Sequence, residues 1–463
     1  MSNDKLDFGN TNIGKLFSKI FFPTLMGMLS TMAFIFTDGI FVGRGIGPNG
    51  LAAINLVGPI MMLISGLGMM LGQGASVIAA IHLAKGNVKA ARINITHTFM
   101  AGILMSMATG LICYCFPRQV LTLLGANGTL YESAYEYYIW FIPTCLLVMI
   151  ESIGLFVIRL DGSPRYAMLS NIMPAIVNII LDYIFIFPCH LGLMGASLAT
   201  DIGGAVSLVM VTYYMFFQST TLKFHRLEAS RDNIIVFLHN IGHTMKMGAS
   251  SLVGEIAVAA MMLTGNLAFK YYIGTDGGSA YSIACYLFPL VYMLYNAVAI
   301  SAQPIISYNY GKKSRHRIGK TMRFSIAIST AIGITTMLLF FFFAPQIAGI
   351  FINNSHAAGK LASSGLPYYA TGFLFMAINI SMVGYYQSIE QAAKATFITL
   401  LRGVIFLVAS FIFMPLWFDK EGLWLAIPVA EMMTTTMIII DMITTTKRQN
   451  IISGYEEHLP HSE

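Results

Sequence analysis

The chain has 463 residues, of which 56% are hydrophobic and only 10% are charged. Soluble domains carry about 25% charged residues, so this composition excludes a water-soluble fold and indicates an integral membrane protein. The formal charge of +6 does not indicate a nucleic-acid-binding protein, because the basic residues lie in short loops between apolar runs, where membrane topology accounts for them.

The apolar runs are long enough for membrane-spanning helices, which need roughly 20 residues each. They are too long and too uniformly apolar for the strands of an outer-membrane barrel. We therefore predict an all-α membrane protein with twelve spanning helices, near residues 16–41, 51–83, 93–116, 134–160, 166–188, 193–217, 243–270, 279–309, 321–345, 365–389, 395–417 and 421–445.

The topology follows from the basic residues. An even number of spans places both termini on the same side. Five of the 27 Lys and Arg residues lie on one predicted side and 22 on the other. Positive residues are retained in the cytoplasm, so both termini and the basic loops are predicted to be cytoplasmic. The polar N-terminus is not followed by a short apolar core and a small-residue cleavage site, so no cleaved signal peptide is expected. The five residues on the outer side are Arg44, Arg118, Lys270, Lys360 and Lys420.

The two halves of the chain resemble each other weakly. Residues 84–92 align with 309–317 at an offset of 225, and residues 191–201 align with 421–431 at an offset of 230. Two like halves of parallel topology are typical of transporters with a cavity between two lobes. We predict two pseudo-symmetric six-helix lobes at 1–217 and 243–446, a cytoplasmic linker at 218–242 and a cytoplasmic tail at 447–463.

Motifs for other kinds of chemistry are missing. The five cysteines are odd in number and form no C-x-x-C pair, so neither a disulfide framework nor a zinc site is expected. The sequence contains no H-E-x-x-H, no G-x-S-x-G and no phosphate-binding G-x-x-x-x-G-K-[ST] motif. An enzyme and a self-contained ATP-driven pump are therefore not predicted, and no cofactor is expected.

Several acidic residues lie inside predicted spans, where each costs about 2.5–3.5 kcal/mol unless it has a partner or a hydrated cavity. At about 1.5 Å per residue, Asp38 and Asp182 lie roughly 28 and 26 Å from the cytoplasmic edge. Thr200 enters from the opposite edge to about the same level, and Asn178 precedes Asp182 by one helical turn. These four side chains are predicted to converge in the first lobe.

Two carboxylates with a neighbouring amide and hydroxyl can hold a hard cation such as Na⁺ or share a proton, because both do not stay ionised at close range in a low dielectric. The alternative is that these polar groups only join helices by hydrogen bonds, as is common in membranes. Both interpretations stay open from the residues alone.

The second half has no copy of this group, since the repeat offsets place Asn266, Phe411 and Ala430 at the positions of Asp38, Asp182 and Thr200. It has Glu255 instead, about 14 Å from the cytoplasmic edge, where a carboxylate attracts a cationic substrate or a coupling ion unless it is a protonated structural residue. Three further buried acids receive no role: Glu151, Asp201 and Glu431.

Four stretches carry a resemblance to the multidrug and toxic compound extrusion (MATE) family, which extends from about residue 15 to 447. The prokaryotic branch with an acidic N-lobe site is the most similar, through the pairing of a D-G-x-P turn with N-I-I-L-D-Y-I-F-I-F. The four stretches are residues 22–43, 159–187, 192–204 and 301–311.

The resemblance implies an antiporter that exports organic cations and other hydrophobic drugs by alternating access, driven by inward flow of Na⁺ or H⁺. It implies that Asp38, Asn178, Asp182 and Thr200 form the cation and proton network. Glu255 resembles an acidic residue used in the C-lobe by another branch, although Asn379 stands where that branch has its acidic partner.

The expected protein is thus a cation-coupled multidrug antiporter of the bacterial cytoplasmic membrane, acting as a monomer on small-molecule drugs within membrane lipid and contributing to antibiotic resistance. Two alternatives remain. One is a flippase for lipids or lipid-linked oligosaccharides, which typically needs a strongly cationic cavity, and the other is a passive channel.

Overall fold

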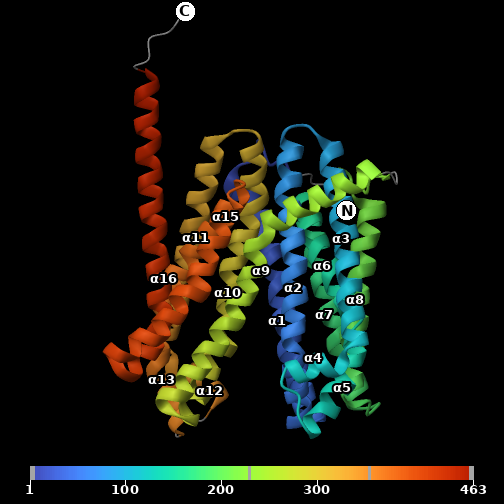
Figure 1. Cartoon of the computed structure of the whole chain (residues 1–463), viewed down its shortest axis with the longest axis vertical. Coiled ribbons are helices and arrows are strands. Elements are labelled where there is room, and N and C mark those ends of the chain that lie inside the picture. Colours follow the sequence, from blue (N-terminus) through green and yellow to red (C-terminus); the bar gives the residue numbers. More distant parts are fainter. Residues whose placement is uncertain (1–5, 228–230, 353–355, 458–463) are drawn as a thin grey trace, which may run out of the picture. The chain divides into compact units, whose positions relative to one another are not determined.

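The computed structural model describes residues 6–227, 231–352 and 356–457, in which all regular structure is helical (Figure 1). The all-α prediction is confirmed. In chain order the elements are α1 (Ile13–Gly45), α2 (Pro48–Ala84), α3 (Val88–Cys115), α4 (Pro117–Leu123), α5 (Thr129–Phe141), α6 (Thr144–Leu160), α7 (Pro164–Ile186), α8 (Gly192–Tyr213), the π-helical turn η1 (Tyr214–Gln218), α9 (Arg231–Ile273), α10 (Thr275–Gly311), α11 (Arg315–Phe342), α12 (Ala344–Phe351), α13 (Ala357–Ala370), α14 (Gly372–Ser388), α15 (Ala392–Leu400), the π-helical turn η2 (Leu401–Ile405) and α16 (Phe406–Glu457).

These helices supply the predicted number of spans. Among the described residues, nine helical segments are long and apolar enough to cross a membrane, and two bent helix pairs qualify as one span each. The segment Ala392–Thr445 holds two spans, because Phe418 and Asp419 leave helical geometry in its middle. The twelve-helix architecture is therefore confirmed, at the positions given by the apolar runs.

The internal repeat is visible in the irregular elements. The chain bends by 51° between α5 and α6 and by 46° between α13 and α14. Pro143 accounts for the first bend, because proline lacks the N–H that would continue the helix. Thr371, at the second bend, follows Pro143 by 228 residues, and the short helices α4 and α12 begin 227 residues apart. The predicted period thus recurs in the bends and in the short helices.

The chain packs into two compact units. Unit 1 comprises 1–259, 292–327 and 383–399, and unit 2 comprises 260–291, 328–382 and 400–463, apart from the residues that are not described. Unit 1 therefore contains the whole first half together with one end of α9, α10, α11 and α14 and nearly all of α15. That end lies on the side of the α2–α3 and α6–α7 turns, which we call the inner side. The units do not follow the predicted lobes, whose boundaries stay a prediction.

Within unit 1, α2 and α9 cross in direct backbone contact. A Cβ atom on Gly74 would collide with the carbonyl oxygen of Thr244, and one on Gly248 would collide with that of Met70. Glycine is required on both helices, because any side chain would force the backbones apart. The crossing joins the two halves of the sequence on the inner side.

Buried hydrogen bonds surround this crossing. The hydroxyl of Ser251 donates to Oε1 of Gln73 at 2.5 Å, and Ser76 and Gln303 are hydrogen-bonded at 3.3 Å. Each bond joins a residue of α2 to a residue of the second half. Buried polar groups are costly when separated, so these bonds favour the crossed arrangement.

Helices extend into the predicted linker and the predicted tail. α9 begins at Arg231 rather than near 243, and α16 runs to Glu457, beyond the predicted end of the last span. Linker residues 228–230 and tail residues 458–463 lie outside the described residues. Asp161, at the end of α6, accepts hydrogen bonds of 2.9–3.1 Å from the hydroxyls of Tyr214 and Ser219 and from the backbone N–H groups of 220–222. The first part of the linker is thereby fixed to the first half.

Candidate functional site

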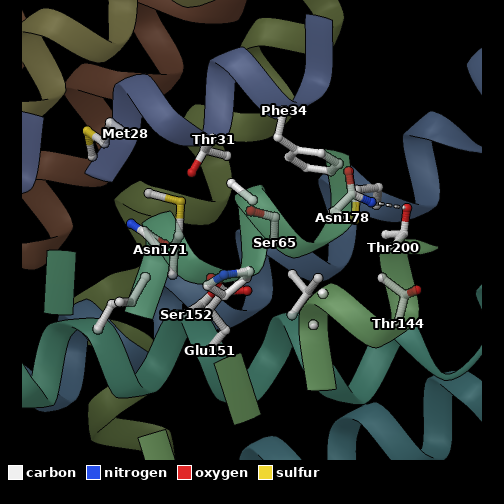
Figure 2. A pocket seen from close by; sticks show the side chains of 18 of the residues that line it. Met28, Thr31, Phe34, Ser65, Thr144, Glu151, Ser152, Asn171, Asn178 and Thr200 are labelled. Atoms are coloured by element: carbon white, nitrogen blue, oxygen red, sulfur yellow. Dashed lines mark hydrogen bonds between the residues drawn. The ribbon is translucent and has the colours of Figure 1, made fainter. Parts of the chain in front are cut away.

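Three helices of unit 1 bring the predicted ion-site residues together. α1 carries Asp38, α7 carries Asn178 and Asp182, and α8 carries Thr200. The carboxyl groups of Asp38 and Asp182 lie within hydrogen-bonding reach of each other. Asn178 Nδ2 donates to Thr200 Oγ1 at 3.3 Å (Figure 2). The structure thus brings Asp38 close to Asp182 and Asn178 close to Thr200, while their role as an ion site stays a prediction.

This group offers more buried acceptors than donors. Asp182 is 0% exposed, and neither of its carboxylate oxygens receives a hydrogen bond from a described residue. The same holds for Asp38 Oδ1 and Asn178 Oδ1. Buried oxygens without donors are unfavourable, and either a proton shared by the carboxylates or a hard cation would satisfy them. The donor set therefore fits H⁺ or Na⁺.

A transition-metal centre is not indicated. No group of three or more His, Cys, Asp or Glu side chains with metal-binding geometry occurs in the described part of the chain. The additional oxygens beside the two carboxylates come from an amide and a hydroxyl, which suit an alkali or alkaline-earth cation better than zinc or copper.

Sequence reasoning missed two neighbours of this site. The buried phenol of Tyr137 on α5 lies within electrostatic range of Asp38, Asp182 and Asp201. Asp201, which had no assigned role, accepts a 2.5 Å hydrogen bond from the hydroxyl of Thr144 at the start of α6. The proline bend between α5 and α6 brings the end of α5 and the start of α6 toward the acids, and the Pro-Thr sequence was the available signal.

A cavity of about 230 Å³ adjoins the ion-site residues within unit 1. Asn178 and Thr200 belong to its wall as well as to the predicted ion site. Figure 2 shows Thr31 and Phe34 of α1 on one side of the cavity and Glu151 and Ser152 of α6 on the other. Three methionines, which adapt to varied apolar shapes, also line the cavity: Met28, Met61 and Met69.

Among the described residues that line the cavity, Glu151 is the one acidic residue and Arg159 is the one basic residue. The Glu151 carboxyl lies within reach of the Ser207 hydroxyl, and the Arg159 guanidinium lies 5.3 Å from the centre of the Phe156 ring. Neither forms an ion pair with a described residue. Glu151, which had no role from the sequence, thus faces the cavity.

Glu255 lies on α9 at its contact with α2. Its Cβ and Cγ pack beside Gly66 of α2, at 3.3 Å from the position a Cβ would take there. It is not among the residues that line the cavity, and its carboxylate forms no ion pair within the described ranges. Its helix segment belongs to unit 1, with the first-half helices. A role for Glu255 stays a prediction.

Glu431 has a structural environment. Its carboxylate accepts hydrogen bonds from Arg402 Nη2 at 2.6 Å and from Asn379 Nδ2 at 2.7 Å. All three side chains are buried in unit 2. Thr435 donates to Asn379 Oδ1 at 2.9 Å. Arg402, in the π-helical turn η2, was counted among the basic residues of the cytoplasmic side, and the structure buries it within a span instead.

Comparison with known proteins agrees with this architecture. The family model described as MatE matches residues 23–184 and 250–412, two segments whose starts lie 227 residues apart. The matched segments cover most of the chain and reproduce its internal repeat. They include the helices that carry Asp38, Asn178 and Asp182.

Curated relatives cover nearly the same length. The multidrug export protein MepA of Staphylococcus aureus (strain MRSA252) is 23% identical over 411 residues, which is 88% of this chain and 89% of MepA. A protein named FAD transporter from Shewanella oneidensis is 23% identical over 347 residues, 73% of this chain and 74% of its own length.

Solved structures show the same fold. A MATE transporter described as outward-facing superposes with a TM-score of 0.86 at 21% identity, covering 94% of this chain and 96% of that one. A MATE structure in the straight conformation gives a TM-score of 0.88 at 20% identity and covers 98% and 100%. With the family match across both halves, these findings show that the chain belongs to the MatE family of multi-pass multidrug transporters, whose members are not enzymes.

Proposed function

We propose that this protein is an antiporter that exports organic cations and other hydrophobic drugs in exchange for H⁺ or Na⁺. The observation that carries the proposal is the group of buried acceptors at Asp38, Asp182 and Asn178, next to a cavity that shares Asn178 and Thr200 with it. An ion site and a substrate cavity with a common wall provide the two binding sites that an exchanger needs.

Coupling requires that the ion and the drug favour different states, because a ligand with equal affinity for both shifts neither. Occupation of the carboxylate pair by H⁺ or Na⁺ removes the repulsion between Asp38 and Asp182 and lets α1 and α7 approach. A change in the position of α1 alters the cavity, since Thr31 and Phe34 line it from that helix. The ion thereby changes the affinity for the drug.

The chemistry of the cavity supports small amphiphilic substrates. Its methionines and phenylalanines offer adaptable apolar contact, and Glu151 offers a negative charge to a cationic group. The relatives named multidrug export proteins support drugs as the substrates.

Alternating access would require the inner side to open. The crossing of α2 and α9 at Gly74 and Gly248 joins the two halves of the sequence there and must separate in the other state. Gly248→Ala should prevent the crossed state and abolish drug export at unchanged protein level. Gly242→Ala in the same helix is the matched control, because nothing lies within 4 Å of its Cβ position. Normal export by Gly248→Ala would show that this crossing is not needed in the cycle.

The remaining parts of the proposal concern location and assembly. The excess of basic residues on the inner side supports a bacterial cytoplasmic membrane with both termini in the cytoplasm. We also propose that the protein works as a monomer within membrane lipid.

The decisive experiment uses the full chain in lipid vesicles loaded with a fluorescent cationic dye. Na⁺ and pH gradients are imposed in turn on the wild type, Asp38→Asn and Asp182→Asn, with the exposed Asp276→Asn as the control. We expect one gradient to drive dye movement, and both site variants to lose it. Dye flux that ignores both gradients would indicate a passive channel, and full activity of both site variants would refute the ion-site assignment.

A further inference from the structure

The cavity extends along one face of α6. Seven of its lining residues follow one another on this helix at intervals of one to four residues, from Thr144 to Arg159. At 1.5 Å per residue, this wall is about 22 Å long. The residues are Thr144, Val148, Glu151, Ser152, Leu155, Phe156 and Arg159.

The wall carries two opposite charges at separate positions. Glu151 lies near its middle and Arg159 at its inner end, eight residues apart, which corresponds to about 12 Å along the helix axis. Apolar side chains lie between them, including Leu155 and Phe156. Because neither charge forms an ion pair within the described part of the chain, each is available to a ligand.

Their surroundings make both charges strong determinants of what binds. Arg159 is only 5% exposed, so its interaction with a bound anion is screened little by water. A guanidinium prefers planar carboxylates, sulfonates and phosphates, which accept two of its hydrogen bonds at once. A carboxylate among methionines prefers an organic ammonium group for the same electrostatic reason.

We propose that the cavity selects elongated amphoteric molecules, with the cationic group at Glu151 and the anionic group at Arg159. This inference rests on the proposed export function and specifies the substrate class of the same cavity. A simple organic cation satisfies Glu151 but leaves Arg159 without a counter-charge, so it binds more weakly than an amphoteric molecule of equal size. Arg159 is thus a specificity-determining residue.

The test measures binding to the purified full chain in lipid nanodiscs, without any ion gradient, by fluorescence anisotropy. The probes are a fluorescent 7-piperazinyl quinolone carboxylic acid, which is amphoteric at neutral pH, and its ethyl ester, which retains only the cation. We expect the wild type to bind the acid about tenfold more tightly than the ester, a difference of about 1.4 kcal/mol.

The variants separate the two charges. Arg159→Gln should bind both probes equally, Arg159→Lys should keep part of the preference, and Glu151→Gln should weaken both probes about tenfold. The exposed Arg165→Gln and Glu132→Gln are the matched controls and should leave both affinities unchanged. Size-exclusion profiles establish that each variant is folded before binding is measured.

Two results would overturn the inference. One is equal binding of acid and ester by the wild type, and the other is an equal loss of both probes in Arg159→Gln, which would make Arg159 a packing residue. The outcome is independent of ion coupling, because no gradient is present. Dye efflux that ignores Na⁺ and pH gradients would defeat the proposed exchange function without removing a measured preference for the acid.

Discussion

Asp182 in the first half and Glu431 in the second are both buried acids, yet their partners differ. Asp182 faces another carboxylate, that of Asp38, and its oxygens receive no hydrogen bond from described residues. Glu431 receives the guanidinium of Arg402 at 2.6 Å and the amide of Asn379 at 2.7 Å. At Glu431 the chain itself provides the positive counter-charge. At Asp182 no described residue provides one.

This difference separates a structural acid from one that can exchange its counter-charge. The side chain of Arg402 is part of the protein and neutralises Glu431 permanently, so Glu431 needs no ion from solution. Among the described residues no basic side chain pairs with Asp38 or Asp182, which is why we propose an exchangeable ion, H⁺ or Na⁺, as their counter-charge. An acid inside a membrane therefore indicates ion coupling only when no basic side chain reaches it.

The largest expected effect comes from removing the guanidinium of Arg402. Arg402→Met leaves Glu431 buried without its counter-charge and should lower the free energy of unfolding by about 3–5 kcal/mol. Thermal unfolding in detergent measures the loss. Arg402→Met combined with Glu431→Leu removes both charges and should recover most of it. No loss in the single variant would mean that the ion pair is unimportant for the fold.

The next variant should leave stability unchanged or raise it, in contrast to Arg402→Met. Asp182→Asn removes an acid whose oxygens receive no hydrogen bond from a described residue, so thermal stability should stay equal or rise while ion-driven dye export falls to background. Glu431→Gln should instead lose stability. The two variants are measured by the same unfolding and export assays, and a matching loss of stability in both would remove the distinction between the acids.

A third variant introduces a basic side chain at the ion site of the first half. Thr200→Lys places an ammonium group near Asn178 and Asp182 and should take the place of the ion. The wild type should be stabilised by the coupling ion, by about 2.7 kcal/mol at a hundredfold excess over its dissociation constant, and Thr200→Lys should lose this response. Thr200→Met is the uncharged control of similar length and should retain it.

The smallest effect concerns Asp201. Thr144→Val removes the hydroxyl that donates to this carboxylate and should lower the free energy of unfolding by about 1–2 kcal/mol. Thr37→Val is the control, since that hydroxyl donates at 2.8 Å to Ala33 in its own helix, and its effect should stay within about 0.5 kcal/mol. Equal effects would show that Asp201 does not depend on Thr144.

Much of this arrangement follows from the sequence. Apolar run length determined the twelve spans, because a bilayer admits few alternatives to a helix of fixed length. Depth along each span then placed Asp38, Asp182 and Thr200 at one level, since the rise of a helix is constant. Both inferences depend on geometry that hardly varies with context.

Arg402 and Tyr137 could not be placed in this way. Arg402 lies in a π-helical turn, which changes the phase of the helix and directs its side chain toward Glu431. Tyr137 approaches the acids because the chain bends by 51° between α5 and α6. Neither the π-turn nor the size of the bend follows from hydropathy, so which side chains meet there had to come from the structure.

Hydrogen bonds in the predicted linker also limit the distance between the first half of the chain and the start of α9. Residues 220–222 are held at the end of α6, and α9 starts at Arg231. The backbone N–H of His225 also donates to Thr96 Oγ1 of α3 at 2.9 Å, so only six peptide steps remain before α9. At no more than about 3.6 Å each, they allow the start of α9 to lie no farther than about 22 Å from His225. Deleting residues between 225 and 231 should therefore limit the movement of α9 and slow transport, whereas inserting glycine and serine there should leave transport unchanged.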